Sequence, residues 1–290
     1  MVGRTTKLSN KRSLPGAGPV MLIGGAEDRF KSKIILARFA SFAGGADGHV
    51  VVVSTASSLG DEATEVYRTL FLGLGIGRVS GLRPVEREEA DDAGVASVLT
   101  DATGVFLTGG NQLRLSSVVS GTRLGRAILL AHDRGAVLAG TSAGASAMAT
   151  HMMAFGASGD SPKNRMAQLS AGLGILQGIV VDQHFEQRNR IGRLSAVIAQ
   201  SPALLGLGLD EDTCAIVYAD QTLEVLGRGA VTIVDGSSVR TNAYEGKGYR
   251  PLMVSGVVLH SLPAGYWFDL RARVLLGTGG RRALEQEASE

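Results

Sequence analysis

The sequence lacks the features that identify several large classes of protein. Its single cysteine, Cys214, excludes an internal disulfide framework and a cysteine-based zinc site. No apolar run reaches about 18 residues, so we expect no transmembrane helix. Only 7 of the 290 residues are proline and 19% are charged, which excludes a disordered chain. The 29 basic and 27 acidic residues nearly balance, and this argues against a nucleic-acid partner.

The common cofactor and metal motifs are also missing. No G-x-G-x-x-G turn follows a predicted strand, and no Gly-Lys-Ser/Thr phosphate loop occurs. No H-E-x-x-H pattern or His/Asp cluster indicates a metal site. Residues 1–18 are basic and polar without an apolar stretch, so we expect a short tail rather than a secretory signal peptide. The sequence therefore predicts a cytoplasmic protein without a membrane partner, a cofactor or a metal.

Glycine, by contrast, is abundant. The chain has 40 glycines, where one of this length usually has roughly half as many. They follow no three-residue period, which excludes a collagen. Several stand where predicted strands end, so the excess calls for a local explanation.

Short apolar segments alternate with helix-like segments through the first two thirds of the chain. Strands are predicted at residues 19–23, 49–53, 79–82, 104–108, 136–139 and 179–181. Asp28 and Asp61 are expected to cap two of the helices between them, and residues 86–100 and 186–199 to form two more. The inner faces expected for the two capped helices are Phe30, Ile34 and Phe42, then Val66, Leu70 and Leu74. This alternation is typical of βαβ units and a mostly parallel sheet.

From Leu205 onward nearly every apolar segment is predicted to be a strand, with hairpin turns between the strands. We therefore expect an α/β fold, with a mostly parallel sheet flanked by helices and a C-terminal antiparallel β extension. The expected boundaries are a tail at residues 1–18, one domain at 19–276 and a charged tail at 277–290.

Residues 140–144, Gly-Thr-Ser-Ala-Gly, form the strongest chemical motif. They follow an apolar strand, precede small residues that suit the start of a helix, and match the G-x-S-x-G pattern of a nucleophile elbow. Such a strained turn holds the serine hydroxyl out of the sheet, with the next backbone N–H facing the same space. Ser142 is therefore a candidate nucleophile. The alternative is an ordinary glycine-rich turn between a strand and a helix.

A nucleophilic serine needs a base and an acid that orients it. Of five histidines, His184 ends an apolar strand, and the carboxyl ends of parallel strands meet at one edge of a sheet. His184 is therefore the candidate base, unless it only caps that strand. Asp210, Glu211 and Asp212 follow a later strand and offer the acid. For the two of these acids that do not orient the base, the interpretation is an ordinary solvated turn.

Backbone and basic groups complete the candidate site. The N–H groups of Ala143 and of Gly110, in the Gly-Gly-Asn-Gln segment at 109–112, are candidates for an oxyanion hole. Three arginines follow the candidate base and would suit bidentate carboxylate recognition. They are Arg188, Arg190 and Arg193. A solvated basic helix face is the alternative interpretation.

Five stretches, in this order, together resemble the cyanophycinases, serine peptidases related to the aspartyl dipeptidase (peptidase E) family. They lie at residues 24–28, 109–112, 140–145, 182–193 and 208–213, and the resemblance extends from Leu22 to about Leu270. It implies a fold like that of class I glutamine amidotransferases and flavodoxin. It further implies Ser142 as nucleophile, His184 as base and Glu211 as orienting acid. The implied substrate-pocket residues are Gln112, Asp182, Gln183, Arg188, Arg190 and Arg193.

The resemblance also implies a substrate. Cyanophycin is a poly-aspartate chain whose side chains carry arginine through isopeptide bonds, and the family releases β-Asp-Arg dipeptides from it. A homodimer without a cofactor is implied as well. Two alternatives stay open: a related dipeptidase for short Asp-containing or isoaspartyl peptides, and a catalytically inert binding protein on the same fold. A lipase-like hydrolase is disfavoured because the acid follows the histidine in the chain.

Overall fold

The structure, a computed structural model, describes residues 16–280. The expected terminal tails lie mainly outside these residues. Within them, Gly18 is buried and donates its N–H to the His132 carbonyl at 3.1 Å, and strand β17 (Val274–Thr278) runs past residue 276. No helix in the described part is long and apolar enough to cross a membrane.

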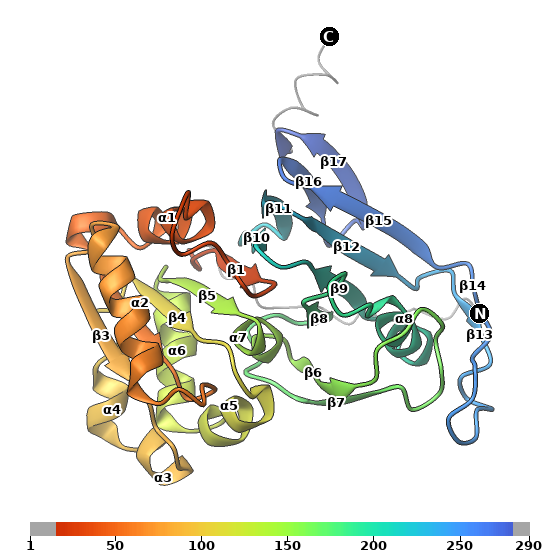
Figure 1. Ribbon diagram of the computed structural model, residues 1–290, viewed down its shortest axis with the longest axis horizontal. Coiled ribbons are helices and arrows are strands. Elements are labelled where there is room, and N and C mark those ends of the chain that lie inside the picture. Colours follow the sequence, from red (N-terminus) through yellow and green to blue (C-terminus); the bar gives the residue numbers. More distant parts are fainter. Residues whose placement is uncertain (1–15, 281–290) are drawn as a thin grey trace, which may run out of the picture.

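The centre of the molecule is one large sheet with a parallel and an antiparallel half (Figure 1). The parallel strands are β1 (Val20–Ile23), β2 (His49–Val53), β3 (Arg78–Leu82), β4 (Gly104–Leu107) and β5 (Val137–Thr141). The antiparallel strands are β10 (Thr213–Val217), β11 (Thr222–Gly227), β16 (Tyr266–Asp269) and β17. The nine strands run β17-β16-β11-β10-β1-β5-β4-β2-β3. The expected α/β fold with an antiparallel extension is confirmed.

Helices cover both faces of the parallel half, which explains why β1, β2, β4 and β5 are buried throughout, whereas the edge strand β3 is partly exposed. On one face, α1 (Ile34–Phe42) and α2 (Asp61–Gly73) pack with Phe106 of β4 into an aromatic core. The opposite face packs against α5 (Gln112–Val119), α6 (Arg123–Asp133) and α7 (Ala143–Ala147). Two short helices, α3 (Arg87–Ala90) and α4 (Ala93–Ser97), lie beside α5 and α6.

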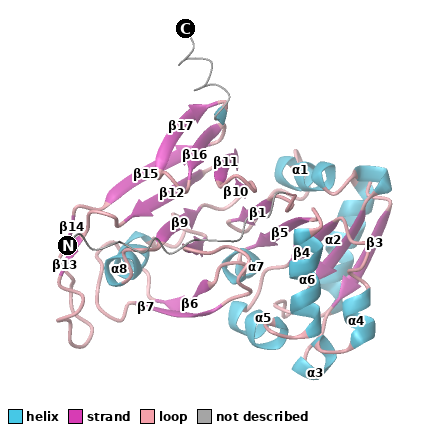
Figure 2. Cartoon of the chain, turned by 180° about the vertical axis from the view of Figure 1, so that it is seen from behind, coloured by secondary structure: helices cyan, strands magenta, loops and turns pink. Residues whose placement is uncertain are grey.

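A second sheet lies next to the first and runs β15-β12-β9-β8. Its strands are β8 (Ile179–Gln183), β9 (Leu205–Leu209), β12 (Ala230–Asp235) and β15 (Val258–Pro263). Helix α8 (Ile191–Gln200) packs on it, and β8 and β9 pair in parallel. Smaller elements are η1 (Gly45–Asp47), the pair β6 (His151–Gly156) and β7 (Ala167–Ala171), and the pair β13 (Arg240–Thr241) and β14 (Val254–Ser255). Figure 2 shows the other helices gathered around the parallel strands, with α8 in the strand-rich part beyond them.

The two expected helix caps were wrong. The Asp28 carboxylate instead accepts the backbone N–H groups of residues 30–33 in a turn, and α1 begins only at Ile34. Phe30, expected inside, is 85% exposed. The cap position of α2 is Gly60, and that helix buries Tyr67 and Phe71 rather than the face containing Val66.

Two other helix predictions were also inaccurate. Residues 86–100 divide into α3 and α4, because Asp92 caps the second helix by accepting the Val95 N–H at 3.0 Å. The helix expected from residue 186 begins at Ile191, because residues 186–190 form a turn with Asn189 in the left-handed region, at φ 47°.

Candidate active site

Ser142 lies directly after β5, at the carboxyl end of the parallel strands. Its backbone has φ 52° and ψ −110° and leads into α7, and its N–H donates to the Ile23 carbonyl at 2.9 Å. Non-glycine residues with positive φ are strained, and such strain concentrates at functional sites. The turn is tight enough to require small neighbours, since a Cβ on Gly144 would stand 2.3 Å from the Leu107 carbonyl oxygen.

His184 follows β8 of the second sheet and reaches across to Ser142. Its Nε2 lies 2.8 Å from Ser142 Oγ. His184 is also left-handed, with φ 47°, and its N–H donates to the Gly24 carbonyl at 2.9 Å. Gly25 lies against the imidazole, and a Cβ at that glycine would stand 2.4 Å from the ring carbon Cε1. The glycine thus allows the backbone of residues 24–28 to pack directly on the histidine.

Glu211 approaches the other ring nitrogen. Its Oε1 lies 2.6 Å from His184 Nδ1, and its own N–H donates to Gln187 Oε1 at 2.9 Å. The two neighbouring acids bond backbone groups instead. Asp210 accepts the Glu186 and Ala230 N–H groups, and Asp212 accepts the Asp28 N–H. The structure therefore brings Ser142, His184 and Glu211 into one hydrogen-bonded series.

The surroundings of His184 favour its neutral imidazole. Burial lowers the pKa of His184 below its usual range, and the positive charge of Arg188 lowers it further, while the hydrogen bond to Glu211 acts in the opposite direction. With Nδ1 donating to the carboxylate, a neutral ring leaves the Nε2 lone pair free to accept the Ser142 hydroxyl proton.

Two backbone N–H groups adjoin the serine. Ala143 is the first residue of α7, where helical N–H groups have no intrahelical acceptor. Gly110 has φ 139° and lies in the loop beside the serine, since a Cβ on Gly109 would stand 3.4 Å from Ser142 Cβ. This loop follows β4, so the two expected oxyanion donors come from neighbouring strand ends.

Three of the expected pocket residues form a buried ionic cluster. Asp182 is 0% exposed, and Arg193 binds both of its carboxylate oxygens, with Nε 2.6 Å from Oδ2. Arg190 Nη1 lies 3.2 Å from Asp182 Oδ1 and also donates to the Gln183 carbonyl. Burial lowers the pKa of Arg190 to about 10, against the opposing charge of Asp182. Arg190 Nε is buried without a hydrogen-bond partner among the described residues.

The remaining expected pocket residues differ in accessibility. Gln183 is buried, and its Oε1 accepts the Ser146 hydroxyl at 3.0 Å. Gln112 donates to the carbonyls of Met153 and Ala154, at 3.2 and 2.6 Å. Arg188 is exposed and lies in the turn after His184. Of the three arginines, it alone has an exposed side chain.

Sequence reasoning missed Gln187, which holds the Glu211 backbone. The residue was visible between the histidine and the arginines, but only the positive charges of that stretch were interpreted. The hydrogen bond joins residues 24 positions apart in the chain. No local pattern in the sequence indicates such a contact.

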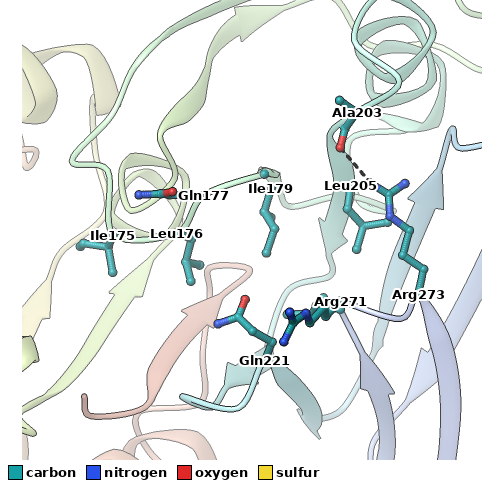
Figure 3. A pocket seen from close by; sticks show the side chains of 11 residues that line it. Ile175, Leu176, Gln177, Ile179, Ala203, Leu205, Gln221, Arg271 and Arg273 are labelled. Atoms are coloured by element: carbon teal, nitrogen blue, oxygen red, sulfur yellow. Dashed lines mark hydrogen bonds between the residues drawn. The ribbon is translucent and has the colours of Figure 1, made fainter. Parts of the chain in front are cut away.

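Two hollows lie outside this cluster. An open groove of about 800 Å³ runs between β6–β7 and the segment around Tyr249, and it includes Gly156, whose carbonyl accepts Arg193 Nη1 at 3.0 Å. A separate cavity of about 230 Å³ lies at the amino ends of β8 and β9, lined by Gln221, Arg271 and Arg273 among others (Figure 3). His184 follows the opposite end of β8, about 13 Å away along the strand. That cavity is therefore separate from Ser142, His184 and Glu211.

Three of the other histidines make contacts away from Ser142, His184 and Glu211. His49 bonds Asp101 and Ser80, His132 bonds the Gly18 carbonyl, and His260 packs edge-on against Phe268. Among residues 16–280, no cluster of three or more His, Cys, Asp or Glu side chains suits a metal ion.

Comparison with known proteins identifies the family. The model of a family described as peptidase family S51 matches residues 20–226. A cyanophycinase of Synechococcus elongatus is 41% identical over 258 residues, which cover 88% of this chain and 80% of that protein. A cyanophycinase of Trichormus variabilis is 41% identical over 260 residues, 89% and 87% of the two chains. A cyanophycinase of Geminocystis herdmanii is 39% identical over 248 residues, 85% and 91% of the two.

Solved structures agree on the fold. A peptidase from an acI-B1 Actinobacterium superimposes with a TM-score of 0.63 at 21% identity, covering 84% of this chain and 97% of that one. A putative peptidase E protein from Listeria monocytogenes gives a TM-score of 0.51 at 15% identity, covering 73% and 98%. With the family match over most of the chain and the curated relatives near 40% identity, this chain belongs to peptidase family S51 and is a serine-type peptidase.

Proposed function

We propose that this chain is an exopeptidase that cleaves cyanophycin, with Ser142 as nucleophile, His184 as general base and Glu211 as the acid that orients the base. The hydrogen-bonded series from Ser142 Oγ through the imidazole to Glu211 carries the proposal for the chemistry. The names of the relatives near 40% identity support the choice of substrate.

The reaction follows from the hydrogen-bond directions. His184 Nε2 takes the proton of Ser142 Oγ as that oxygen attacks the scissile carbonyl carbon. The imidazolium formed is stabilised by Glu211. It then gives the proton to the leaving amine as the C–N bond breaks, which leaves an acyl-serine. A water molecule, deprotonated by the same imidazole, attacks the ester and restores the free serine.

The negative oxygen of each tetrahedral intermediate needs donors at fixed positions. The N–H groups of Gly110 and Ala143 adjoin Ser142 from two strand ends, and we assign them this role. Because both donors belong to the backbone, neither reorganises during the reaction. Removal of one oxyanion-hole donor in another serine peptidase costs about 3–4 kcal/mol of transition-state stabilisation.

Charge recognition falls to the arginines that retain free donors. Exposed Arg188 and the unpartnered Nε of Arg190 are the groups we assign to substrate carboxylates. Two buried arginines face one buried carboxylate, Asp182, so the cluster has an excess positive charge that an anionic substrate group would balance. In this proposal, Asp182 and Arg193 hold Arg190 in place, while Gln112 and Gln183 fix the surrounding backbone and Ser146.

Incubation of the purified chain with cyanophycin, followed by chromatography of the soluble products, tests the proposal. We expect β-Asp-Arg dipeptides from the wild-type protein and a loss of at least about 10⁴-fold in rate for Ser142→Ala. Undiminished release by that variant contradicts the assignment of the nucleophile.

A panel of short Asp-containing and isoaspartyl peptides, run in parallel, separates the two substrate classes. Release from the peptides but not from the polymer identifies the chain as a dipeptidase. A folded protein that cleaves neither the polymer nor the peptides contradicts both substrate assignments.

We further propose a cytoplasmic homodimer. Apolar side chains on the edge strands β15 and β17 support a self-association surface, since Leu259 is 55% exposed and Leu275 is 47% exposed. Light scattering coupled to size-exclusion chromatography should give twice the mass of the chain, and Leu259→Glu with Leu275→Glu should give one chain. A monomeric wild-type protein contradicts this proposal.

A further inference from the structure

One buried acid next to the active site takes no part in the reaction just described. Glu27 belongs to the stretch Gly-Gly-Ala-Glu-Asp at residues 24–28, which follows β1, and it is only 5% exposed. A buried carboxylate is costly unless donors satisfy its oxygens. The hydrogen-bond partners of Glu27 therefore indicate its role.

Each carboxylate oxygen of Glu27 accepts one hydroxyl. Oε1 accepts Tyr67 Oη and Oε2 accepts Thr141 Oγ1, both at 2.5 Å. Tyr67 comes from α2 and packs on Phe106 in the aromatic core, with ring centroids 4.6 Å apart. Thr141 is the last residue of β5 and directly precedes Ser142. Glu27 thus connects the rigid core to the residue beside the nucleophile.

The backbone around Glu27 contacts the two other segments of the triad. The Gly24 carbonyl accepts the His184 N–H, and the Gly25 carbonyl accepts the Asp212 N–H, both at 2.9 Å. The Asp28 N–H donates to Asp212 Oδ1 at 2.8 Å. The short segment 24–28 therefore touches the serine, histidine and acid segments at once, and Glu27 provides its link to the serine side.

We propose that Glu27 is a positioning residue that sets the distance and angle between Ser142 and His184. The inference rests on the proposed function, because it presumes that these two residues react. Glu27 touches no substrate in this scheme and acts only by fixing segment 24–28 against Thr141. Removal of either hydroxyl contact lets the serine and histidine segments shift relative to each other.

The test uses Glu27→Gln, which keeps the side-chain volume but replaces one acceptor oxygen with an amide donor. We measure kcat and KM together with the second-order rate of inactivation by a serine-directed fluorophosphonate. A misplacement of about 1 Å costs roughly 100-fold in rate, so kcat and the inactivation rate should fall together by about 10- to 100-fold. KM should stay within about twofold, because the arginines that bind substrate are unchanged.

Thr141 supplies a matched pair that remains informative if Glu27→Gln does not fold. Thr141→Val removes the hydroxyl and should lower kcat and the inactivation rate to the same extent. Thr141→Ser keeps the hydroxyl and should retain wild-type rates. Inactivation rates within twofold of wild type for both Glu27→Gln and Thr141→Val overturn the proposal. So does a lower melting temperature without a change in rate per folded molecule.

The fluorophosphonate also separates this inference from the proposed function. It reports on the alignment of Ser142 whatever the natural substrate is. If Ser142→Ala reacts as fast as the wild-type protein, the proposed nucleophile is wrong. If only cleavage of cyanophycin fails, the substrate is wrong and the role of Glu27 is still measured.

Discussion

Three arginines follow His184 within one turn and the start of α8, and they differ in burial and in contacts. Arg188 is exposed, Arg190 is buried with a free Nε, and Arg193 binds both oxygens of Asp182. From the sequence alone they form one cluster of positive charge. The differences arise from contacts with β8, which precedes them, and with Gly156, 37 positions from Arg193.

Neutralisation of Arg188 should shift the pH dependence of hydrolysis. Burial lowers the pKa of His184, and the Arg188 charge lowers it further. Arg188→Gln removes only the effect of the Arg188 charge, so the pKa of His184 rises. Because the base must be neutral, the acid limb of kcat/KM should move to higher pH. A pH–rate profile with a short peptide substrate measures the shift. Arg68→Gln, on the exposed side of α2, is the control and should leave the limb in place.

Removal of the Asp182 charge should destabilise the fold as well as affect activity. Asp182→Asn leaves two buried guanidinium groups without their carboxylate, which costs about 3–5 kcal/mol of unfolding free energy. Urea denaturation measures the loss, and exposed Asp160→Asn, in the neighbouring loop, is the control. Unchanged stability with weaker substrate binding would show that Asp182 contacts the substrate instead.

At the scale of elements, the parallel strands were predicted closely and the helices less so. Buried strands are short continuous apolar runs, and residues 49–53 match β2 at both ends. Helix faces depend on how the helix is rotated, so Val66 was placed inside although α2 buries Tyr67. Ser142 and Gly110 follow neighbouring strands of the large sheet, as expected, whereas His184 follows a strand of the second sheet, which the sequence did not separate from the first. The contacts of Glu27, by contrast, join residues 40 and 114 positions apart.

The loop after β1 should tolerate no side chain at its second glycine. A Cβ on Gly25, at φ 101°, would stand 2.4 Å from the His184 ring. Gly25→Ala must displace the imidazole from Ser142 Oγ, and we expect kcat to fall by about 100-fold or more.

Gly45→Ala separates that clash from backbone strain. Gly45 also has positive φ, at 56°, but a Cβ added there would meet no other atom within 4 Å. The activity of this variant per folded molecule should equal that of the wild-type protein. An equal loss of activity in both variants would mean that strain, rather than displacement of His184, is the cause.

At the scale of the whole molecule, an aromatic core on one face of the large sheet anchors the parallel half. Phe106 lies fully buried against Phe39, Tyr67 and Phe71, with ring centroids 4.6–5.6 Å apart. Tyr67 also holds Glu27, so this core and the candidate site share a residue. The stability of the sheet and the geometry of the site are therefore linked.

Truncation of that core should be costly. Phe106→Ala removes a fully buried ring that packs on three other rings, and we expect a loss of about 3–5 kcal/mol in unfolding free energy by guanidinium denaturation. Phe30→Ala, at a position 85% exposed, should change it by less than about 0.5 kcal/mol. Similar losses in the two variants would contradict the packing described here.

The two sheets have a consequence for how activity arises during folding. Ser142 belongs to the large sheet and His184 to the small one, while Glu211 lies in the connection from β9 to β10, where the chain passes from one to the other. Neither sheet alone holds all three residues of the proposed triad. Under the proposed mechanism, a nascent or partly unfolded chain is an inactive peptidase, and hydrolysis reports on the docking of the two sheets. Proteolytic chemistry is thereby confined to molecules that have finished folding.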